Sequence, residues 1–273
     1  MSSDDRYVYF SQALTAVLPG PGVVAVFRRD DTEGALSLVQ EIELDAASSL
    51  ALSPDGSHLY ASGVVFARDP VAGTLTMASV SPCGRAKKIQ VSPDALNVYC
   101  LPKSTSELLV LDRDAATGAV EVRESLPLSD GPSDLAVTSD GERVYVTTQF
   151  ADSVLVFRRD QATGRLMQEE ALRNGVAGIE GLLEPRLIAL SPDGSNIYVN
   201  ASGKFDPDES VREGKAIVVL RRQPEGLRFV QVEREGIVDD TDQIEAISVA
   251  PDGRHVYALS PSANRVLEFR RLR

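Results

Sequence analysis

The sequence predicts an all-β fold built from repeated antiparallel units, and three observations support this prediction. A turn motif, Ser-Pro-Asp-Gly at 191–194 followed by a strand that reaches Tyr198, recurs with variations along the chain. Apolar residues come in short bursts that alternate as strands do and are too short for helices. Glycines follow these bursts at corresponding places. Together these features predict a β-propeller of four-stranded antiparallel blades.

The turn motif marks six periods, whose intervals of roughly 40 to 60 residues are typical of propellers. Its aspartate recurs at Asp4, Asp55, Asp94, Asp140, Asp193 and Asp252. A turn aspartate commonly accepts hydrogen bonds from backbone N–H groups of its own turn. We therefore predict that all six aspartates cap turns and that none is catalytic.

Each period contains up to four predicted strands. The first precedes the turn, as in Leu50-Ala-Leu and Ile188-Ala-Leu, and suits an inner strand between neighbouring sheets. The third is an aliphatic burst such as 154–157, and the fourth mixes apolar and polar residues as an outer strand should. The second follows the turn and carries a tyrosine that we expect to pack its ring in the core; these are Tyr9, Tyr60, Tyr99, Tyr145, Tyr198 and Tyr257.

The turn between the third and fourth strands carries a glycine in five periods. A left-handed backbone conformation is cheap only for glycine, so we predict that conformation here. The five residues are Gly34, Gly73, Gly118, Gly164 and Gly226.

The repeat pattern is incomplete at both ends of the sequence. The first period begins at the turn before its second strand, and the sixth stops within its third strand. We expect one propeller domain over residues 1–273 with six blades and incomplete terminal blades; seven blades completed by another chain is the alternative. Open strand edges can pair with further strands, so a protein partner or self-association through them is expected.

These residues also resemble a known family. The Ser-Pro-Asp-Gly turn, the strand Val144-Tyr-Val-Thr and the hairpin 157–164 (Phe-Arg-Arg-Asp-Gln-Ala-Thr-Gly) are similar to YVTN-repeat, lactonase-like bacterial propellers. The resemblance covers essentially the whole chain. That superfamily includes 6-phosphogluconolactonases, so the resemblance implies a propeller fold and, as one activity, hydrolysis of a sugar-acid lactone.

Charge and hydropathy narrow the range of partners. The chain has 28 Lys and Arg against 40 Asp and Glu, a net charge of −12. Nucleic acids and anionic membrane surfaces require a cationic surface, so neither is expected as a partner. Apolar runs fall short of a membrane span, and residues 1–5 lack the features of a secretory signal, so a cytoplasmic location is expected.

The two cysteines, Cys83 and Cys100, do not form a metal-binding or redox motif. Two cysteines are too few for a disulfide framework, and they lack CxxC spacing. We expect free structural thiols, with a bridge or a reactive thiol as alternatives.

Candidate binding residues lie where each inner strand starts, because propellers bind ligands at the channel mouth that these loops form. The first residue of each turn motif is Ser, Thr or Ala, and the position five residues before it differs from period to period. This position is occupied by Ser48, Lys87, Ser133, Arg186 and Glu245, and neighbouring positions add Arg85, Lys88, Asp134, Glu184, Asp242 and Gln243. These positions vary between periods. We predict a site for a small anionic or sugar-like ligand, with arginine as a bidentate partner; solvated strand starts are the alternative. The predicted residues are Arg85, Lys87, Asp134, Arg186 and Glu245.

Other conspicuous residues are expected to be structural. His58 and His255 occupy the same polar position beside a turn, equivalent to Asn196, so neither is a predicted general base. The insertion 201–215 contains Asp206, Asp208 and Glu209, which offer the hard oxygen ligands that Ca²⁺ takes but lack the spacing of a calcium loop. A solvated or partner-contacting loop is expected there. The connections 174–184 and 236–242 are expected to shape one side of the channel mouth or to pack locally.

Sequence motifs for catalysis or cofactor binding are absent. The chain lacks a nucleophile elbow, a phosphate-binding glycine loop, a zinc-ligand pattern and a dinucleotide fingerprint, so no cofactor or metal is expected. We therefore predict a binding or interaction module. The alternative is a lactonase-type hydrolase, in which Arg186 or Lys87 polarises the carbonyl and Glu245 or Asp134 activates water.

Overall fold

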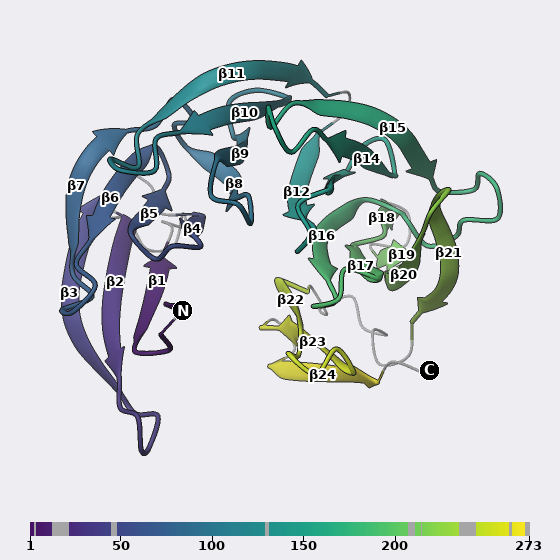
Figure 1. The fold of residues 1–273 in the computed structure, drawn as a ribbon. Coiled ribbons are helices and arrows are strands. Elements are labelled where there is room, and N and C mark those ends of the chain that lie inside the picture. The colour runs from purple at the N-terminus through teal and green to yellow at the C-terminus, as the bar shows by residue number, and fades with distance from the viewer. Residues whose placement is uncertain are drawn as a thin grey trace. The chain divides into compact units, whose positions relative to one another are not determined.

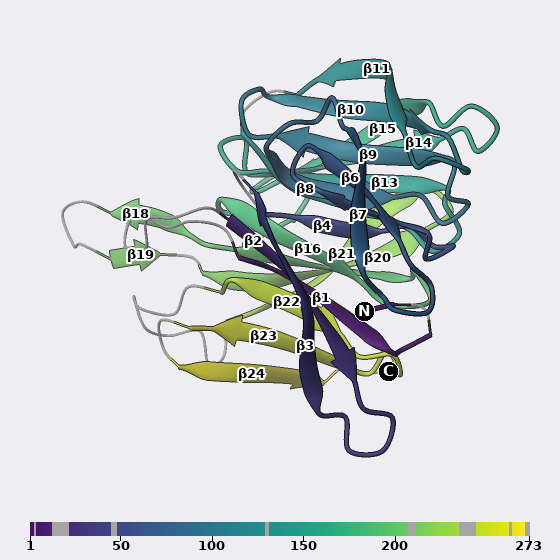
Figure 2. The same cartoon turned by 90° about the vertical axis from the view of Figure 1, so that its left-hand side faces the viewer.

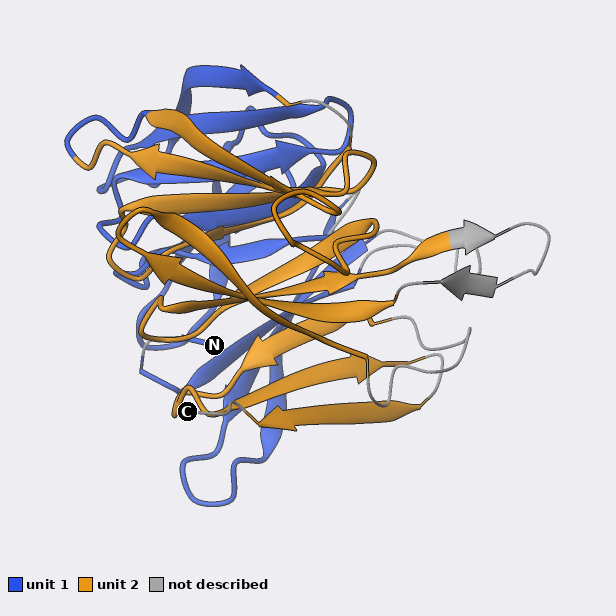
Figure 3. Ribbon diagram, turned by 90° about the vertical axis from the view of Figure 1, so that its right-hand side faces the viewer, with its two compact units in different colours: residues 1–127, 162–165 blue, residues 128–161, 166–273 orange. Residues whose placement is uncertain are grey.

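All regular elements of the described residues are β-strands (Figure 1). The computed structural model describes residues 1–2, 4–12, 22–44, 48–128, 131–206, 211–213, 215–234, 244–261 and 264–270, with backbone only at 205–206 and 211–213. The part of the chain that it describes offers no helix capable of crossing a membrane. The described residues divide into two compact units, coloured separately in Figure 3.

Unit 1 comprises residues 1–127 and 162–165 and contains three antiparallel sheets (Figure 2). The first sheet is β1 (Tyr7–Gln12), β2 (Gly22–Arg29) and β3 (Leu36–Leu44). The second is β4 (Leu50–Leu52), β5 (His58–Ala61), β6 (Val64–Arg68) and β7 (Leu75–Val80). The third is β8 (Ala86–Val91), β9 (Asn97–Pro102), β10 (Glu107–Arg113) and β11 (Val120–Pro127).

Unit 2 comprises residues 128–161 and 166–273 and contains three further blade sheets. The fourth sheet is β12 (Pro132–Val137), β13 (Arg143–Thr148), β14 (Ser153–Arg159) and β15 (Leu166–Arg173). The fifth is β16 (Pro185–Leu190), β17 (Asn196–Ala201), β20 (Ala216–Gln223) and β21 (Gly226–Glu233), with the hairpin β18 (Lys204–Asp206) and β19 (Val211–Glu213) inserted. The sixth is β22 (Ala246–Val249), β23 (His255–Ser260) and β24 (Arg265–Arg270).

The predicted fold class is confirmed: the chain is an all-β propeller, and its described residues form six blades. Strands consecutive within a blade pair antiparallel, and the predicted order of inner, tyrosine-bearing, third and outer strand holds in each complete blade. The first and sixth sheets have three strands in the described residues. The apolar core forms clusters between successive sheets of each unit.

A β-bulge recurs in every outer strand at the same place. In each case two residues of the outer strand lie opposite one residue of its neighbour, which increases the local twist. The extra residues are Val39, Ala78, Arg123, Glu169 and Val230. The outer strands of all five hairpins therefore share one backbone geometry, although their side chains differ.

The turn aspartates cap turns as predicted. Asp55 accepts a hydrogen bond from Ser53 Oγ and another from Ser57 N at 3.0 Å. Asp94 repeats this pattern with Ser92 Oγ and Leu96 N. The carboxylate thus fixes the turn that joins an inner strand to the next strand.

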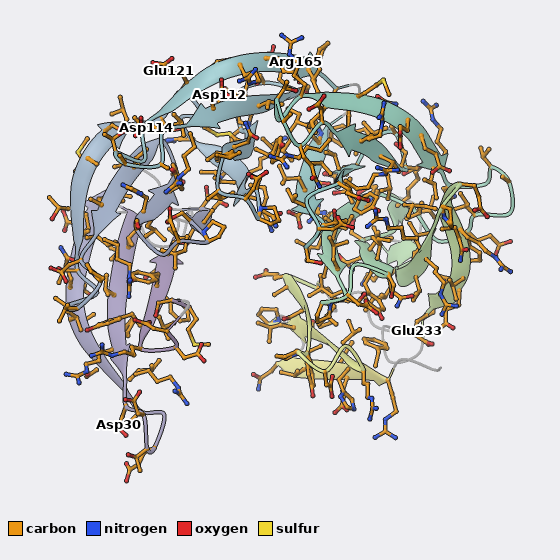
Figure 4. The ribbon with its side chains drawn as sticks, viewed as in Figure 1. Asp30, Asp112, Asp114, Glu121, Arg165 and Glu233 are labelled. Atoms are coloured by element: carbon orange, nitrogen blue, oxygen red, sulfur yellow. A yellow bond between two sulfur atoms is a disulfide. The ribbon has the colours of Figure 1, made fainter. Side chains whose placement is uncertain are left out.

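A second aspartate caps the hairpin before each of several outer strands. Asp30 Oδ1 accepts from Thr32 N at 2.9 Å and Glu33 N at 2.8 Å, at the hairpin tip visible in Figure 4. These backbone hydrogen bonds lower the pKa of Asp30. Asp69 and Asp114 cap their hairpins in the same way. Gly34 closes the first hairpin at a φ of 70°, the left-handed conformation that the sequence predicted.

Four tyrosines of the second strands bury their rings as expected, namely Tyr60, Tyr99, Tyr145 and Tyr198. For Tyr257 the expectation is wrong, because its side chain in β23 is 39% exposed. Tyr60 is 1% exposed, and its hydroxyl donates to the carbonyl of Gly118 at 2.9 Å. Arg113 Nε donates to the same hydroxyl at 2.8 Å. At the preceding junction Tyr9 donates to the carbonyl of Gly73 at 3.1 Å and accepts from Arg68 Nε. At these two junctions of unit 1 the repeated tyrosine is therefore a docking residue between successive sheets.

His58 belongs to this scaffold. Its ring is 4% exposed, and Nδ1 lies 2.9 Å from Arg113 Nη2. Burial, with the nearby positive charge of Arg113, lowers the pKa of His58. His255 contacts Asp252 through Nδ1 at 3.0 Å and stacks on Tyr257. Both placements fit the structural role expected for the two histidines.

The expectation of free thiols is wrong, because Cys83 and Cys100 form a disulfide. Both side chains are buried, at 3% and 0% exposure, within the apolar cluster that contains Tyr60. Cys83 precedes β8 by three positions and Cys100 lies in β9, so the bond fixes the loop before β8 to its own sheet. Spacing along the sequence did not reveal this pairing because it depends on how β8 and β9 align.

Candidate functional site

The starts of three inner strands share a β-bulge, and its extra residue is the predicted variable position. In β8 Ala86 and Lys88 lie opposite consecutive residues of β9, which leaves Lys87 as the extra residue. The same shift makes Ser133 the extra residue of β12 and Arg186 that of β16. Bulges of this kind re-aim a side chain and are common beside functional sites.

In unit 1 the predicted residues are Arg85 and Lys87. Arg85 is exposed just before β8, and its carbonyl accepts from Lys103 N at 2.7 Å. Lys87 is half-buried. The disulfide begins two residues before Arg85, so the loop that carries these two cations is covalently held to β9.

In unit 2 the predicted residue Asp134 joins two neighbouring sheets. Its side chain is buried; Oδ1 accepts from Leu135 N at 2.9 Å, and Oδ2 accepts from Ile188 N in β16 at 3.0 Å. In unit 1 Ser49 occupies the corresponding position and accepts from Ile89 N of the next inner strand, also at 3.0 Å. This correspondence assigns Asp134 a positioning role for β16.

The neighbouring serines strengthen this connection between sheets. Ser133 Oγ donates to the carbonyl of Pro185 at 2.7 Å, and in unit 1 Ser48 Oγ donates to the carbonyl of Ala86 at 2.7 Å. The starts of β12 and β16 are therefore joined by hydrogen bonds at Pro185 and Ile188, one on each side of Arg186.

Arg186 presents a buried donor for which the described residues provide no acceptor. Its Nε is inaccessible to solvent and has no hydrogen-bond partner. Buried polar groups are nearly always hydrogen-bonded, and an exception calls for a specific explanation. Arg186 as a whole is only half-buried, so a guanidinium held at the start of an inner strand is suited to an acceptor oxygen of a ligand.

Two acidic residues beside Arg186 adopt left-handed backbone conformations. Asp152, in the turn between β13 and β14, and Glu184, just before β16, both have φ of 49°. Such a conformation is unfavourable for residues other than glycine and concentrates at functional sites. Asp152 Oδ1 accepts from Glu184 N at 2.9 Å, which links the two strained positions.

Further polar groups complete this network. Lys204 Nζ lies 2.7 Å from Asp152 Oδ2, and this hydrogen bond raises the pKa of Lys204. Gln149 Nε2 donates to Glu184 Oε2 at 3.2 Å, and Ser202 Oγ donates to the Glu184 carbonyl at 3.1 Å. We call Gln149, Asp152, Glu184, Arg186, Ser202 and Lys204 the strand-start site of unit 2.

Glu245 lies at the start of the neighbouring inner strand. Its side chain is exposed, and its backbone N donates to the carbonyl of Leu259 at 2.9 Å. Strand β22, which follows it, contacts β16. Arg186 and Glu245 therefore belong to neighbouring sheets of unit 2, whereas Arg85 and Lys87 belong to unit 1.

Some predicted positions lie outside the described residues: Asp242, Gln243, the connection 236–242, Asp208 and Glu209. Asp206 is described by its backbone only, in β18. Among the residues that the structure describes, no group of three or more His, Cys, Asp or Glu side chains could hold a metal ion.

Sequence reasoning missed Gln149, Asp152, Ser202 and Lys204. Their location in loops between second and third strands was a weak signal, since such loops line the binding end of a blade. Their linkage depends on the positive φ of Asp152 and Glu184, which a sequence does not display for acidic residues. The result is a polar site that can bind an oxygen-rich, partly anionic molecule through Arg186 and Lys204.

Comparisons with known proteins agree with this fold. The family model described as "Lactonase, 7-bladed beta-propeller" matches residues 83–178 and 124–203. No curated protein matches the chain. The described residues here form six blades, one fewer than that description specifies.

Solved structures of similar fold carry related names. A candidate 6-phosphogluconolactonase from Bacteroides uniformis is 20% identical, with a TM-score of 0.78 over 99% of this chain and 79% of that one. A periplasmic gluconolactonase from Pseudomonas aeruginosa is 20% identical, with a TM-score of 0.76 over 99% of this chain and 80% of that one. A protein of unknown function from Desulfotomaculum acetoxidans is 15% identical, with a TM-score of 0.72 over 99% and 80%.

The solved structures show the fold, and the family model matches part of the chain, residues 83–203. The repeated turn, the tyrosine-bearing strand and the hairpin that suggested the resemblance all lie in blade scaffolding that the structure confirms. The chain is a β-propeller, and its residues 83–203 are similar to the lactonase family of propellers.

Proposed function

We propose that the chain is a lactone hydrolase that acts on a sugar-acid lactone at the strand-start site of unit 2. The match to the lactonase family model and the gluconolactonase names of similar structures support this activity better than the binding module first expected. The observation that carries the proposal is the half-buried guanidinium of Arg186, whose Nε lacks an acceptor among the described residues.

Arg186 supplies the group that polarises the lactone carbonyl. A preorganised donor stabilises the negative charge that develops on this oxygen when water adds to the carbonyl carbon. Because Arg186 sits in a β-bulge whose flanking strands are joined by Asp134 and Ser133, little reorganisation is needed when the charge forms. Lys204 provides a second positive charge for a hydroxyl-rich or phosphorylated substituent.

Glu245 supplies the general base. Its carboxylate is exposed, whereas both carboxylate oxygens of Asp134 already accept backbone N–H groups. Glu245 takes a proton from water as the water oxygen bonds to the carbonyl carbon, and Arg186 holds the resulting oxyanion. The bond from that carbon to the ring oxygen then breaks, and the proton passes from Glu245 to the ring oxygen, which yields the open-chain hydroxy acid.

The role of Glu245 as the base is tested by measuring hydrolysis of five- and six-membered sugar lactones. The acid that is released serves as the readout of the rate. Glu245→Gln is expected to lower kcat by about 100-fold, within the usual contribution of a positioned base. Arg254→Ala, which alters an exposed arginine in the turn between β22 and β23, is the matched control and should retain the full rate. An unchanged rate in Glu245→Gln would exclude Glu245 as the base.

A further inference from the structure

An exposed aromatic ring adjoins the strand-start site of unit 2. Phe150 lies in the turn between β13 and β14, and its side chain is 72% exposed. Gln149, just before it, and Asp152, two residues after it, both form hydrogen bonds with Glu184 of the site. Exposed apolar side chains are common on protein surfaces, so exposure by itself gives Phe150 no role. Its role depends on how the ring is held and on which groups surround it.

The backbone on both sides of Phe150 is fixed. Gln149 N donates to the carbonyl of Gly131 at 2.9 Å, and Asp152 N donates to the carbonyl of Gln149 at 3.4 Å. The side chain of Asp152 is itself held, because it accepts from Glu184 N at 2.9 Å. The turn 149–152 therefore presents Phe150 from a preorganised backbone, which lowers the entropic cost of binding a ligand there.

The ring of Phe150 lies over Gly131, immediately before β12. A Cβ at Gly131 would lie 2.6 Å from Phe150 Cδ2, so the glycine leaves room for the ring. The start of β12 is joined to the start of β16, where Ser133 Oγ donates to the carbonyl of Pro185. The ring of Phe150 and the side chain of Arg186 are therefore carried at the same end of two neighbouring sheets.

The turn itself does not require an aromatic residue. The backbone hydrogen bond before Phe150 recurs in the third sheet, where Lys103 N donates to the carbonyl of Arg85 at 2.7 Å. The next residue there, in the place of Phe150, is Ser104. By the same hydrogen-bond pattern, Gly203 takes that place in the fifth sheet. An aromatic ring is thus a property of the fourth sheet and not of the shared scaffold.

The combination of an exposed ring and polar groups matches the chemistry of a cyclic sugar. Hydroxyl groups project around the rim of a sugar ring, and its C–H groups form an apolar face. Small-molecule sites pair apolar and aromatic surface with a few placed polar groups. Here Arg186, Lys204 and their neighbours supply the polar groups, and Phe150 supplies the apolar surface. An open-chain sugar acid has no such C–H face.

We infer that Phe150 stacks on the C–H face of a ring-closed sugar and thereby discriminates the cyclic lactone from its open-chain acid. This inference rests on the proposed function, because it places the ring at the same site. Phe150 determines specificity and takes no part in proton transfer. Its loss should therefore raise KM for gluconolactone and leave kcat unchanged, as expected when an interaction shared by ground and transition states is removed.

Binding is measured with gluconolactam, in which an N–H group replaces the ring oxygen of gluconolactone and the amide resists hydrolysis. It is titrated calorimetrically into the whole 1–273 chain, and open-chain gluconate is titrated in parallel. Phe150→Ala should bind the lactam about tenfold more weakly, since burial of one ring face contributes on that order. Its affinity for gluconate should be unchanged.

Three further variants separate stacking from a general apolar contact. Phe150→Tyr keeps the flat ring and should bind the lactam as wild type does, whereas Phe150→Leu loses the flat ring and should bind it more weakly. Phe10→Ala is the matched control, because Phe10 is also exposed, at 58%, but packs edge-on against Phe27 in unit 1. It should keep the wild-type affinity. The unfolding midpoint of each variant establishes that it is folded.

The inference is overturned if wild type does not bind the lactam, if Phe150→Ala binds it as tightly as wild type, or if gluconate binding falls equally. Any of these results is compatible with hydrolysis of gluconolactone. Conversely, lactam binding that depends on Phe150, without lactone hydrolysis, would contradict the proposed function and leave the stacking role standing. Self-association of wild type that is lost in Phe150→Ala, with lactam binding unchanged, would identify a protein contact and overturn the inference.

Discussion

The Tyr60 hydroxyl in the second sheet accepts a hydrogen bond from Arg113 Nε in the third sheet, with the two atoms 2.8 Å apart. The Arg113 guanidinium also contacts Asp55 Oδ2 at 3.0 Å and the carbonyl of Ala95 at 3.0 Å. One arginine therefore joins the turn aspartate and the tyrosine of one blade to the turn of the next. This explains why the aspartate and the tyrosine recur together in the sequence.

Replacement of Arg113 by alanine is expected to destabilise the protein strongly. Its side chain is fully buried, and its removal leaves the Tyr60 hydroxyl and His58 Nδ1 without this donor. Loss of one partner from a buried charged network typically costs about 3 kcal/mol or more. Urea unfolding measures the change, and Arg123→Ala, at a more exposed ion pair on β11, should change stability by about 1 kcal/mol or less. Equal effects of the two variants would contradict the docking role.

The stability of the protein should fall in acid through Asp55. Burial alone would raise the pKa of Asp55, but hydrogen bonds from Ser53, Ser57 and Arg113 outweigh it and lower the pKa to about 2. The folded state therefore binds its proton more weakly than the unfolded state, whose carboxyl titrates near 3.8. This contribution is complete above pH 3.8 and is lost as the pH falls toward 2.

Unfolding midpoints in urea between pH 7 and pH 2 test this contribution. Asp55→Asn should be less stable than wild type at pH 7, with a difference that shrinks as the pH approaches 2. Asp31→Asn, at an exposed carboxylate, serves as the control and should follow the wild-type curve. A difference between Asp55→Asn and wild type that stays constant over this range would contradict the assignment.

Gly118 should not tolerate a side chain. A Cβ there would lie 2.3 Å from His58 Cδ2, in addition to the strain of a φ of 71°. Gly175 has a similar φ of 75°, but no atom lies within 4 Å of the place that a Cβ would occupy. Substitution at Gly175 therefore measures the cost of the left-handed backbone conformation alone. Gly175→Ala should cost about 1 kcal/mol, whereas Gly118→Ala should cost about 3 kcal/mol because overpacking is added. Thermal unfolding of both variants measures the difference, and similar losses would contradict close packing at Gly118.

The disulfide between Cys83 and Cys100 should leave no thiol to alkylate. Mass measurement after alkylation of freshly isolated, unreduced protein is expected to show no added label, and two labels would contradict the bond. The cysteines are separated by 17 positions, and closing a loop of this size contributes about 3 kcal/mol, so the double Cys→Ala variant should unfold earlier. Disulfides persist in oxidising compartments, so the result also bears on the expected cytoplasmic location.

The scaffold could be predicted from the sequence because it repeats. Tyr60, Asp55 and Gly118 each occur at corresponding places in other periods, and a residue type that recurs at one position reveals a shared backbone role. The strands and the left-handed hairpin glycines were predictable from this repetition. The bulge that places Arg186 was not predictable, since an extra residue in one strand is defined only by its pairing with β17.

The candidate site was only partly predictable for the same reason. Arg186 and Asp134 were selected because they vary between periods, yet the structure gives them different roles. Asp134 binds backbone amides of two strands, whereas the Arg186 Nε has no acceptor in the part of the chain that the structure describes. Sequence variation at a strand start identifies a candidate binding position. Only the hydrogen bonds in the structure show whether the side chain at that position holds the strands together or is available to a ligand.

The hydrolysis of gluconolactone by wild type and Arg186→Ala is the most direct test of the proposed function. Loss of one preorganised donor to an oxyanion typically lowers kcat by about 100- to 1000-fold, so we predict a loss of that size at an unfolding midpoint close to that of wild type. Wild-type protein without lactonase activity, or an Arg186→Ala variant that keeps the full rate, would contradict the account.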